Sequence, residues 1–268
     1  MLLDIGSIVH HSEKDKFEFK HDLILDTMNT MGYDVMNLSR FDLKSSLNFL
    51  EHTCKKSDMT LVSANNSLKA PDNECLAPYV IKTVNGVKIG ITGVMFDLPL
   101  KGANAQRYSI ERPHLALQRI IPELKSKSDF IILLSELVAN DTQELVDMIP
   151  GIDLALCIDN SPVNTARVPE TKVMSIIDKG QELGVITLEN SDQPLSIKHI
   201  ERVSLDNTIP SDPSVKKIVD DQTRKAFLAK RKKNKPNIPP QPSKDDMMKN
   251  LKLSPEEFLK QYDKPITD

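Results

Sequence analysis

Short β-rich runs alternate with helical patterns over the first two hundred residues of the chain. A strand-like run at residues 1–5 is followed at residues 20–31 by apolar residues at helical spacing, and Gly32 is suited to end that helix. The runs at 130–135 and 152–158 are almost wholly apolar, as expected of strands whose two faces are both covered. This alternation is typical of crossover connections, so it predicts an α/β fold with a largely parallel sheet.

The same sequence patterns predict the remaining strands and helices. Asn85-Gly86 separates two apolar runs and is typical of a type I′ hairpin turn. Three later runs follow one another with only turns between them, which predicts an antiparallel meander. The expected strands are 1–5, 33–38, 59–64, 79–84, 87–94, 130–135, 152–158, 172–177, 183–189 and 195–203. The expected helices are 20–31, 44–54, 113–124, 141–148 and 212–230.

The composition changes after residue 230, which predicts an α/β domain over 1–230 and an extended arm over 231–268. Basic residues at 230–235 lead into a proline-rich stretch that contains Pro239 and Pro240. The basic run could touch nucleic acid or an anionic surface, but a solvated helix end is the better interpretation. A capping box at Ser254 to Glu257 then predicts a short helix. Its apolar side consists of Phe258, Leu259 and Tyr262, and it is too short to be stable without docking.

Charge and composition exclude several classes of protein. The net charge of −3 gives no general attraction to nucleic acid, and the 4% aromatic content with no Trp disfavours base-stacking surfaces. No apolar run is long enough to span a membrane, and no secretion signal is expected at the start of the chain. Cys54, Cys75 and Cys157 are odd in number and far apart, so neither a disulfide framework nor a Cys-x-x-Cys site is predicted, and Cys157 is expected in the core.

Several runs, taken in order over residues 1–228, carry a family resemblance. They are residues 2–7 (LLDIGS), 31–38 (MGYDVMNL), 61–65 (LVSAN), 78–93 (PYVIKTVNGVKIGITG), 129–135 (DFIILLS) and 150–154 (PGIDL), with the turn 180–184 after them. In this order the chain resembles the catalytic domain of the 5′-nucleotidase branch of the calcineurin-like metallophosphoesterases. The resemblance implies a layered sandwich of mixed sheets and helices. It also implies two divalent metals, held by Asp, His and Asn at the strand ends.

The positions that match the family's metal ligands hold other residues here. The first strand of the family, with its Asp-x-His pair, has no counterpart in this sequence. Ser7 stands where the resemblance implies a bridging Asp, and Arg40 and Phe41 replace an Asn and a His. Glu136 replaces another His. The closing Gly-His-x-His aligns with residues 158–161, which include Asp159 and Ser161. Only Glu136 and Asp159 can still bind a cation, so no metal, no cofactor and no hydrolytic reaction are expected.

Two other groups of residues have the chemistry of a metal site. His10 and His11, beside Glu13 and Asp15, could form a relocated metal site, but solvated loop residues are the better interpretation. Glu136 and Asp159 could hold a cation, but an ion pair with Arg40 is favoured. A nucleotide sensor is disfavoured because the nucleobase pocket of the family lies in a separate C-terminal domain.

The resulting hypothesis is a catalytically inactive metallophosphatase-like protein that acts as a structural, assembly or partner-binding subunit. Without the family's first strand, a sheet edge is expected to be exposed, and either a rearranged domain, another chain or cleavage of the chain would account for it. Partner binding or self-association is predicted through this edge and through the arm, at Pro239, Pro240, Phe258, Leu259 and Tyr262. The alternative is a metal-dependent phosphoesterase or 5′-nucleotidase with a rebuilt metal site. The compartment stays open, although the resemblance implies a periplasmic location if a signal peptide has been removed.

Overall fold

The computed structural model describes residues 1–8, 17–45, 48–68, 76–97, 99, 101–158, 173–176, 180–189, 195–233, 254 and 256. The chain divides into two compact units, Met1–Gln222 and Thr223–Asp268. The boundary expected near residue 230 falls inside helix α7 (Pro213–Lys233) and stays a prediction. Each unit is described by itself.

The first unit contains two larger β-sheets. One is parallel throughout and the other is parallel except for the β6–β7 hairpin. The parallel sheet has the order β1 (Leu3–Asp4), β2 (Val35–Asn37), β3 (Thr60–Val62), β5 (Leu76–Ala77). The mixed sheet has the order β11 (Val173–Ile176), β10 (Leu154–Ile158), β9 (Phe130–Ser135), β7 (Val87–Val94), β6 (Tyr79–Val84).

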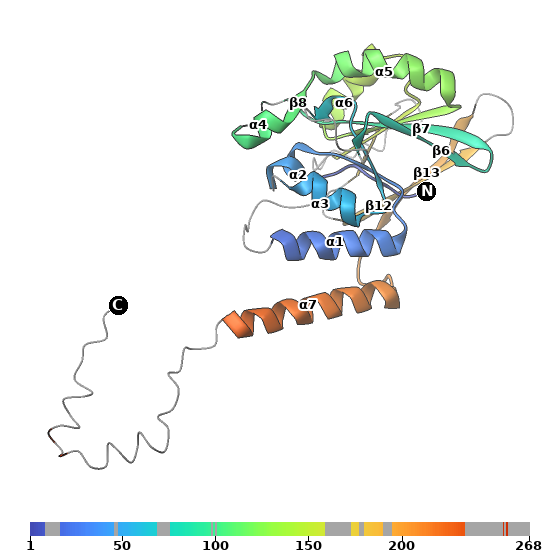
Figure 1. The fold of residues 1–268 in the computed structure, drawn as a ribbon. Helices are drawn as coiled ribbons and strands as arrows, with labels where there is room; N and C mark the ends of the chain where they lie inside the picture. The colour runs from blue at the N-terminus through green and yellow to red at the C-terminus, as the bar shows by residue number, and fades with distance from the viewer. Residues whose placement is uncertain are drawn as a thin grey trace. The chain divides into compact units, whose positions relative to one another are not determined.

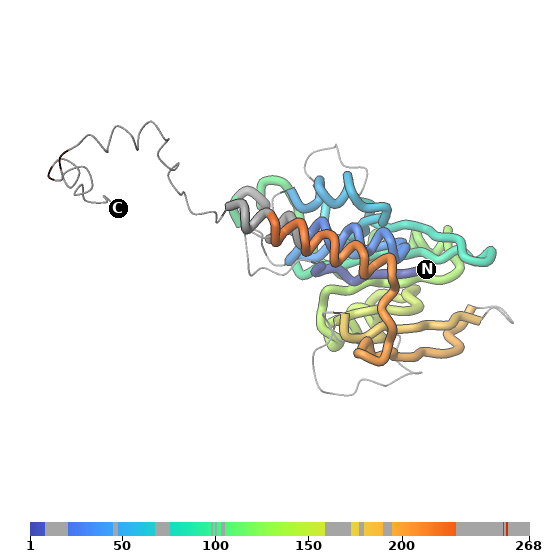
Figure 2. Tube along the Cα trace, turned by 90° about the horizontal axis from the view of Figure 1, so that it is seen from below, coloured from blue at the N-terminus to red at the C-terminus, as the bar shows by residue number. Residues whose placement is uncertain are grey.

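Helices cover the outer faces of these sheets, and the two sheets pack on each other (Figures 1 and 2). Val35 and Val62 of the parallel sheet pack with Ile91 and Leu134 of the mixed sheet, which forms a core between the layers. The helices of this unit are α1 (Phe17–Met31), α2 (Arg40–Ser45), α3 (Phe49–Lys56), α4 (Ala103–Arg107), α5 (Pro113–Lys127) and α6 (Ala139–Met148). Helices α1 and α3 cover the parallel sheet, and α5 and α6 cover the mixed sheet. The predicted α/β class is therefore confirmed.

Two small antiparallel sheets complete the first unit. They are β12 (Glu182–Glu189) with β13 (Ser196–Ser204), and β4 (Asn66–Leu68) with β8 (Tyr108–Ile110). The predicted three-stranded meander is wrong, because β11 pairs in parallel with β10 and only β12 and β13 form a hairpin. Val173 packs into the core on one side of β11 and Met174 into the core on the other. A strand that is buried on both faces belongs inside a layered sheet.

Local side-chain chemistry explains where several elements begin. The single helix expected over 44–54 is instead α2 and α3, because Ser39 Oγ accepts hydrogen bonds from the N–H groups of Phe41 and Asp42 and starts a helix earlier. The hairpin at 79–94 is confirmed, with Asn85 and Gly86 at positive φ of 50° and 84°. Asp212 caps α7 by accepting from two backbone N–H groups, as its predicted start required. Among the described helices, none has the length and hydropathy to cross a membrane.

Candidate functional site

A tight turn at Gly6 and Ser7 ends β1 and opens the candidate site. Both residues adopt positive φ, 97° for Gly6 and 66° for Ser7. A Cβ atom on Gly6 would lie 2.5 Å from the carbonyl oxygen of Asn37, so the close approach of β2 requires glycine there. Asp4 stabilises the turn, because its Oδ1 accepts a hydrogen bond of 2.7 Å from the Gly6 N–H. Ser7 is an uncommon case of a non-glycine residue in the left-handed region.

The buried side chain of Asp42 ties this turn to the start of α2. Its Oδ2 accepts a 2.9 Å hydrogen bond from the Ser7 N–H and a 3.3 Å hydrogen bond from the Ser39 N–H. The Ser7 hydroxyl also donates to Ser39 Oγ at 3.0 Å. One carboxylate oxygen of Asp42 therefore organises two backbone turns.

Glu136 follows β9 and brings the mixed sheet to the same place. Its buried Oε2 accepts hydrogen bonds of 3.2 Å from the N–H groups of Arg40 and Phe96. The Nε of Arg40 lies 3.7 Å from Glu136 Oε1, so the favoured ion pair between these two residues is present. The Arg40 guanidinium also lies over two aromatic rings, 4.7 Å from the centroid of Phe41 and 4.3 Å from that of Phe96.

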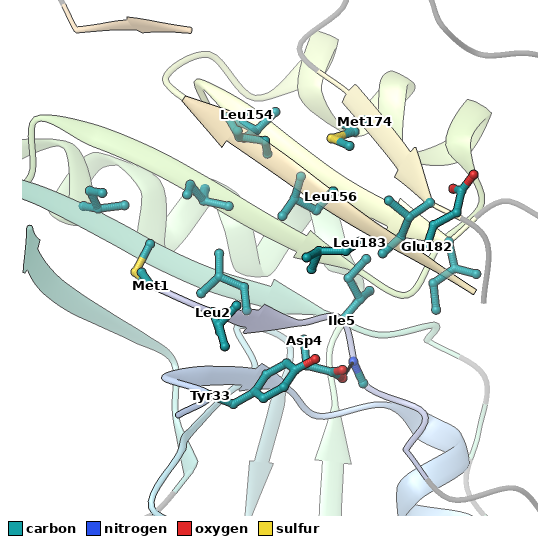
Figure 3. A pocket seen from close by; sticks show the side chains of 18 of the residues that line it. Met1, Leu2, Asp4, Ile5, Tyr33, Leu154, Leu156, Met174, Glu182 and Leu183 are labelled. Carbon is teal, nitrogen blue, oxygen red and sulfur yellow. Dashed lines mark hydrogen bonds between the residues drawn. The ribbon is translucent and has the colours of Figure 1, made fainter. Parts of the chain in front are cut away.

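Burial favours the neutral form of two acids at this site. Burial raises the pKa of Asp4 to about 7, with the charge of Asp42 adding to the effect and the Gly6 N–H opposing it. Burial likewise raises the pKa of Glu136 to about 7, against the backbone N–H bonds and the charge of Arg40. The aromatic ring of Tyr33 lies beside Asp4 (Figure 3), and burial together with the Asp4 charge raises the pKa of the Tyr33 hydroxyl.

A large apolar cavity extends from these acids along β1. Its volume is about 1130 Å³, which exceeds the range typical of pockets for small ligands. Its walls come from β1, β9, β10, β11 and β12, and include Leu2, Leu156, Met174 and Leu183 (Figure 3). The polar groups of the lining include Asp4 and Glu136. The cavity therefore has an acidic part and a long apolar wall.

The structure brings together some of the predicted site residues. Ser7, Phe41 and Glu136 all line this cavity, and Arg40 contacts both Phe41 and Glu136. Other predicted residues lie outside the described part of the chain. These are His10, His11, Glu13, Asp15, Cys75, Asp159, Ser161, Pro239, Pro240, Phe258, Leu259 and Tyr262. Cys157 is buried in the core, as expected.

Sequence reasoning missed Asp4 and Asn37 as parts of the site. Asn37 is buried at the end of β2, and its Nδ2 donates to the carbonyl of Ile5 at 3.1 Å and to that of Val94 at 3.0 Å. It therefore joins the end of β1 to β7, and these two strands belong to different sheets. A polar residue inside an otherwise apolar strand was the signal that could have identified it.

The described residues do not fit a two-metal centre. The permanent cation of Arg40 lies where the resemblance implies an amide ligand, and it would repel a metal ion. Asp42 accepts two backbone N–H groups, and one oxygen of Glu136 accepts two more. Within the described ranges, no three His, Cys, Asp or Glu side chains are grouped so as to hold a metal ion.

Comparison with known proteins supports the resemblance. No family model matches the chain. Protein UshA of Yersinia enterocolitica is 27% identical over 110 residues, which span 39% of this chain and 20% of UshA. Because so little of UshA is covered, its activity is not carried over to this chain.

Solved structures share the fold. The calcineurin-like phosphoesterase YfkN of Bacillus subtilis superposes with a TM-score of 0.66 at 20% identity, covering 86% of this chain and 85% of that one. The 5′-nucleotidase precursor of Thermus thermophilus gives 0.68 at 17% identity, with coverage of 84% and 49%. The NAD nucleotidase NadN of Haemophilus influenzae gives 0.64 at 14%, with coverage of 85% and 51%. The chain spans about half of these two nucleotidases. It thus resembles the calcineurin-like phosphoesterases and 5′-nucleotidases, and it has their α/β fold of mixed sheets and helices.

Proposed function

We propose that this metallophosphatase-like chain is catalytically inactive and serves as a structural or partner-binding subunit of a larger complex. The observation that carries the proposal is the position of Arg40. Its guanidinium lies between Glu136 and the rings of Phe41 and Phe96, at the strand ends where the resemblance implies metal ions. A fixed cation stabilised by an acid and two aromatic faces is costly to displace.

Two further features support the loss of hydrolysis. Ser7 offers a neutral hydroxyl in place of a bridging carboxylate, and that hydroxyl already donates to Ser39. Phe41 stands where the resemblance implies an imidazole, and its phenyl ring can neither donate nor accept a proton. Removing one positioned group from an active site typically lowers the rate by about two to three powers of ten, and several are replaced here.

The alternative is a metal-dependent phosphoesterase with a rebuilt site that uses Glu136, Asp159 and His10 or His11. Protein purified without chelator separates the two proposals when its metal content is measured and it is assayed on AMP and p-nitrophenyl phosphate. We expect no stoichiometric manganese, zinc or iron and no turnover above the blank, with YfkN as the positive control. Stoichiometric metal with turnover that is lost in Glu136→Gln would establish the alternative.

The arm over residues 231–268 is proposed to contribute contacts to the partner or to a second copy. Pro239 and Pro240 would hold it extended, and Phe258, Leu259 and Tyr262 would supply an apolar docking side. Deleting residues 236–268 should lower the oligomeric mass measured by light scattering or abolish co-purification with the partner. An unchanged assembly in the deleted protein would remove the arm from the proposal.

A further inference from the structure

The cavity beside β1 lies between two sheets that one additional β-strand would join. Within the described residues, β1 is the terminal strand of the parallel sheet. On the opposite wall of the cavity, β12 belongs to a separate two-stranded sheet. A hairpin of two strands is marginally stable by itself, whereas a strand placed between β1 and β12 would make the two sheets continuous.

Backbone groups on both walls face the gap. Val35 of β2 donates to the carbonyl of Leu2, and backbone groups of successive residues in a parallel ladder point to opposite sides. The N–H and C=O of Leu3 therefore point away from β2. On β12, the bond from the Leu205 N–H to the Gln181 carbonyl fixes the register. Because Gln181 bonds to the chain of β13, the residues two and four positions later also point toward β13. The backbone groups of the intervening residues Gly184 and Ile186 therefore point away from β13.

The side chains around the gap specify what the added strand must look like. Leu154, Leu156 and Met174 of the mixed sheet form the floor of the cavity, so every second residue of the strand should be apolar. At the carboxyl end of β1, Asp4 and Glu136 line the cavity and both lie near Asp42, and Arg40 is paired with Glu136. A basic side chain at that point of the added strand would pair with these acids and favour their charged form.

We propose that the cavity between β1 and β12 accepts an extended segment of a partner protein, with alternating apolar residues and a basic residue near Asp4 and Glu136. The segment adds as a β-strand by pairing with Leu3 on one side and with Gly184 and Ile186 on the other. This inference rests on the proposed partner-binding function, for which it names the site and the chemistry of the partner.

The test uses the full chain and a defined peptide, acetyl-Thr-Val-Thr-Val-Thr-Val-Lys-amide. Amide hydrogen exchange followed by NMR should slow at least ten-fold at Leu3, Gly184 and Ile186 when the peptide is added. Asp4 and Val185, which already bond to neighbouring strands, should change little. The same peptide with N-methylated valines should bind at least ten-fold more weakly, because it lacks three backbone donors. A Glu in place of the Lys should weaken binding several-fold.

Two variants of β12 form a matched pair. Ile186 lines the cavity, and Val185 is 38% exposed on the opposite face of the strand. Ile186→Trp should therefore fill the gap and abolish peptide binding, and Val185→Trp should bind like the unmodified chain. Equal binding by both variants would overturn the proposal.

Other ligands of the cavity would give different results in the binding and hydrogen-exchange experiments. If dodecanoate competes with the peptide and neither protects the three amides, the cavity holds an aliphatic ligand and the proposal is wrong. Protection of these amides that rises with protein concentration alone would assign the site to a second copy and also overturn it. Turnover with bound metal would overturn the proposed function but leave the exchange result unaffected, so the two failures are distinguishable.

Discussion

Two buried polar regions of the first unit differ in how well their groups are satisfied. Asn65, after β3, uses its whole amide: Nδ2 donates to the carbonyls of Met95 and Glu111, and Oδ1 accepts from the Met95 N–H. At the strand ends, Glu136 Oε1 and Arg40 Nε are buried without a hydrogen bond. The buried groups of the first region are fully hydrogen-bonded, whereas the ion pair of the second region leaves these two atoms without a hydrogen bond.

This difference separates residues that stabilise the fold from residues that are buried at an energetic cost. A satisfied buried amide stabilises both the layers it joins. A buried acid with a pKa raised to about 7 destabilises the folded state at neutral pH, and proteins tolerate such groups mainly at sites of binding or catalysis. The strand ends are therefore a candidate site, although the described side chains do not fit two metals.

The largest effect is expected from Asn65→Leu, which tests whether the satisfied region stabilises the fold. The change leaves the N–H and C=O of Met95 and the C=O of Glu111 without their buried partner. It should lower the free energy of unfolding by about 3–5 kcal/mol. Urea denaturation measures this loss, and exposed Asn207→Leu should lie within about 0.5 kcal/mol of the unmodified chain. A loss below about 1 kcal/mol at Asn65 would remove the contrast between the two regions.

The next effect is expected from Arg40→Met, which removes the charge that offsets Glu136. At pH 8 the buried carboxylate would lose its cation, and we expect a loss of about 2–3 kcal/mol. At pH 5, below the pKa of about 7, Glu136 is protonated and the loss should be smaller. Lys44→Met, at an exposed position of the same helix, should show no such pH dependence. An equal loss at both pH values would mean that Arg40 acts by packing alone.

Local chemistry predicted those elements whose signal lies within a few residues. The β6–β7 hairpin followed from Asn85-Gly86, and the start of α7 from Asp212-Pro213. Strands of two or three residues, such as β4, β5 and β8, carry too little alternation to be recognised, because their pairing partners are distant in the sequence.

The candidate site could be predicted only in part. The resemblance placed Ser7, Arg40, Phe41 and Glu136 together, although Arg40 and Glu136 are 96 positions apart. Nothing local in the sequence indicates that Asp42 binds the Ser7 backbone 35 positions away. The cavity depends on side chains from several strands, so it appears only when the layers are assembled.

Glu136→Gln should change the pH dependence of stability. The folded state holds the proton of Glu136 up to a pKa of about 7, whereas the unfolded chain releases it near the ordinary value of 4.5. The unmodified protein should therefore lose about 1–3 kcal/mol of stability from this group as the pH rises from 4.5 to 7. Denaturation midpoints across this range should fall less steeply in Glu136→Gln. The slope that remains reflects Asp4, whose pKa is raised in the same direction.

The control for this measurement is Glu144→Gln, at an exposed position of α6, which should keep the slope of the unmodified chain. If the denaturation midpoints of Glu136→Gln and Glu144→Gln fall with the same slope as the pH rises, Glu136 does not destabilise the folded state at neutral pH. The carboxylate of Glu136 would then be as well stabilised by its surroundings as the amide of Asn65.

The smallest effect is expected from Ser7→Gly, which tests for backbone strain at the strand ends. At a φ of 66° glycine avoids a steric cost of roughly 1–2 kcal/mol. The lost bond from the Ser7 hydroxyl to Ser39 offsets about 0.5–1.5 kcal/mol of that gain. The net result should be a stabilisation of about 0.5 kcal/mol in urea denaturation. Ser109→Gly, at an exposed position of β8, should instead destabilise, because glycine weakens a strand. Loss of stability at both positions would show that the Ser7 hydroxyl, like the Asn65 amide, is held for the fold.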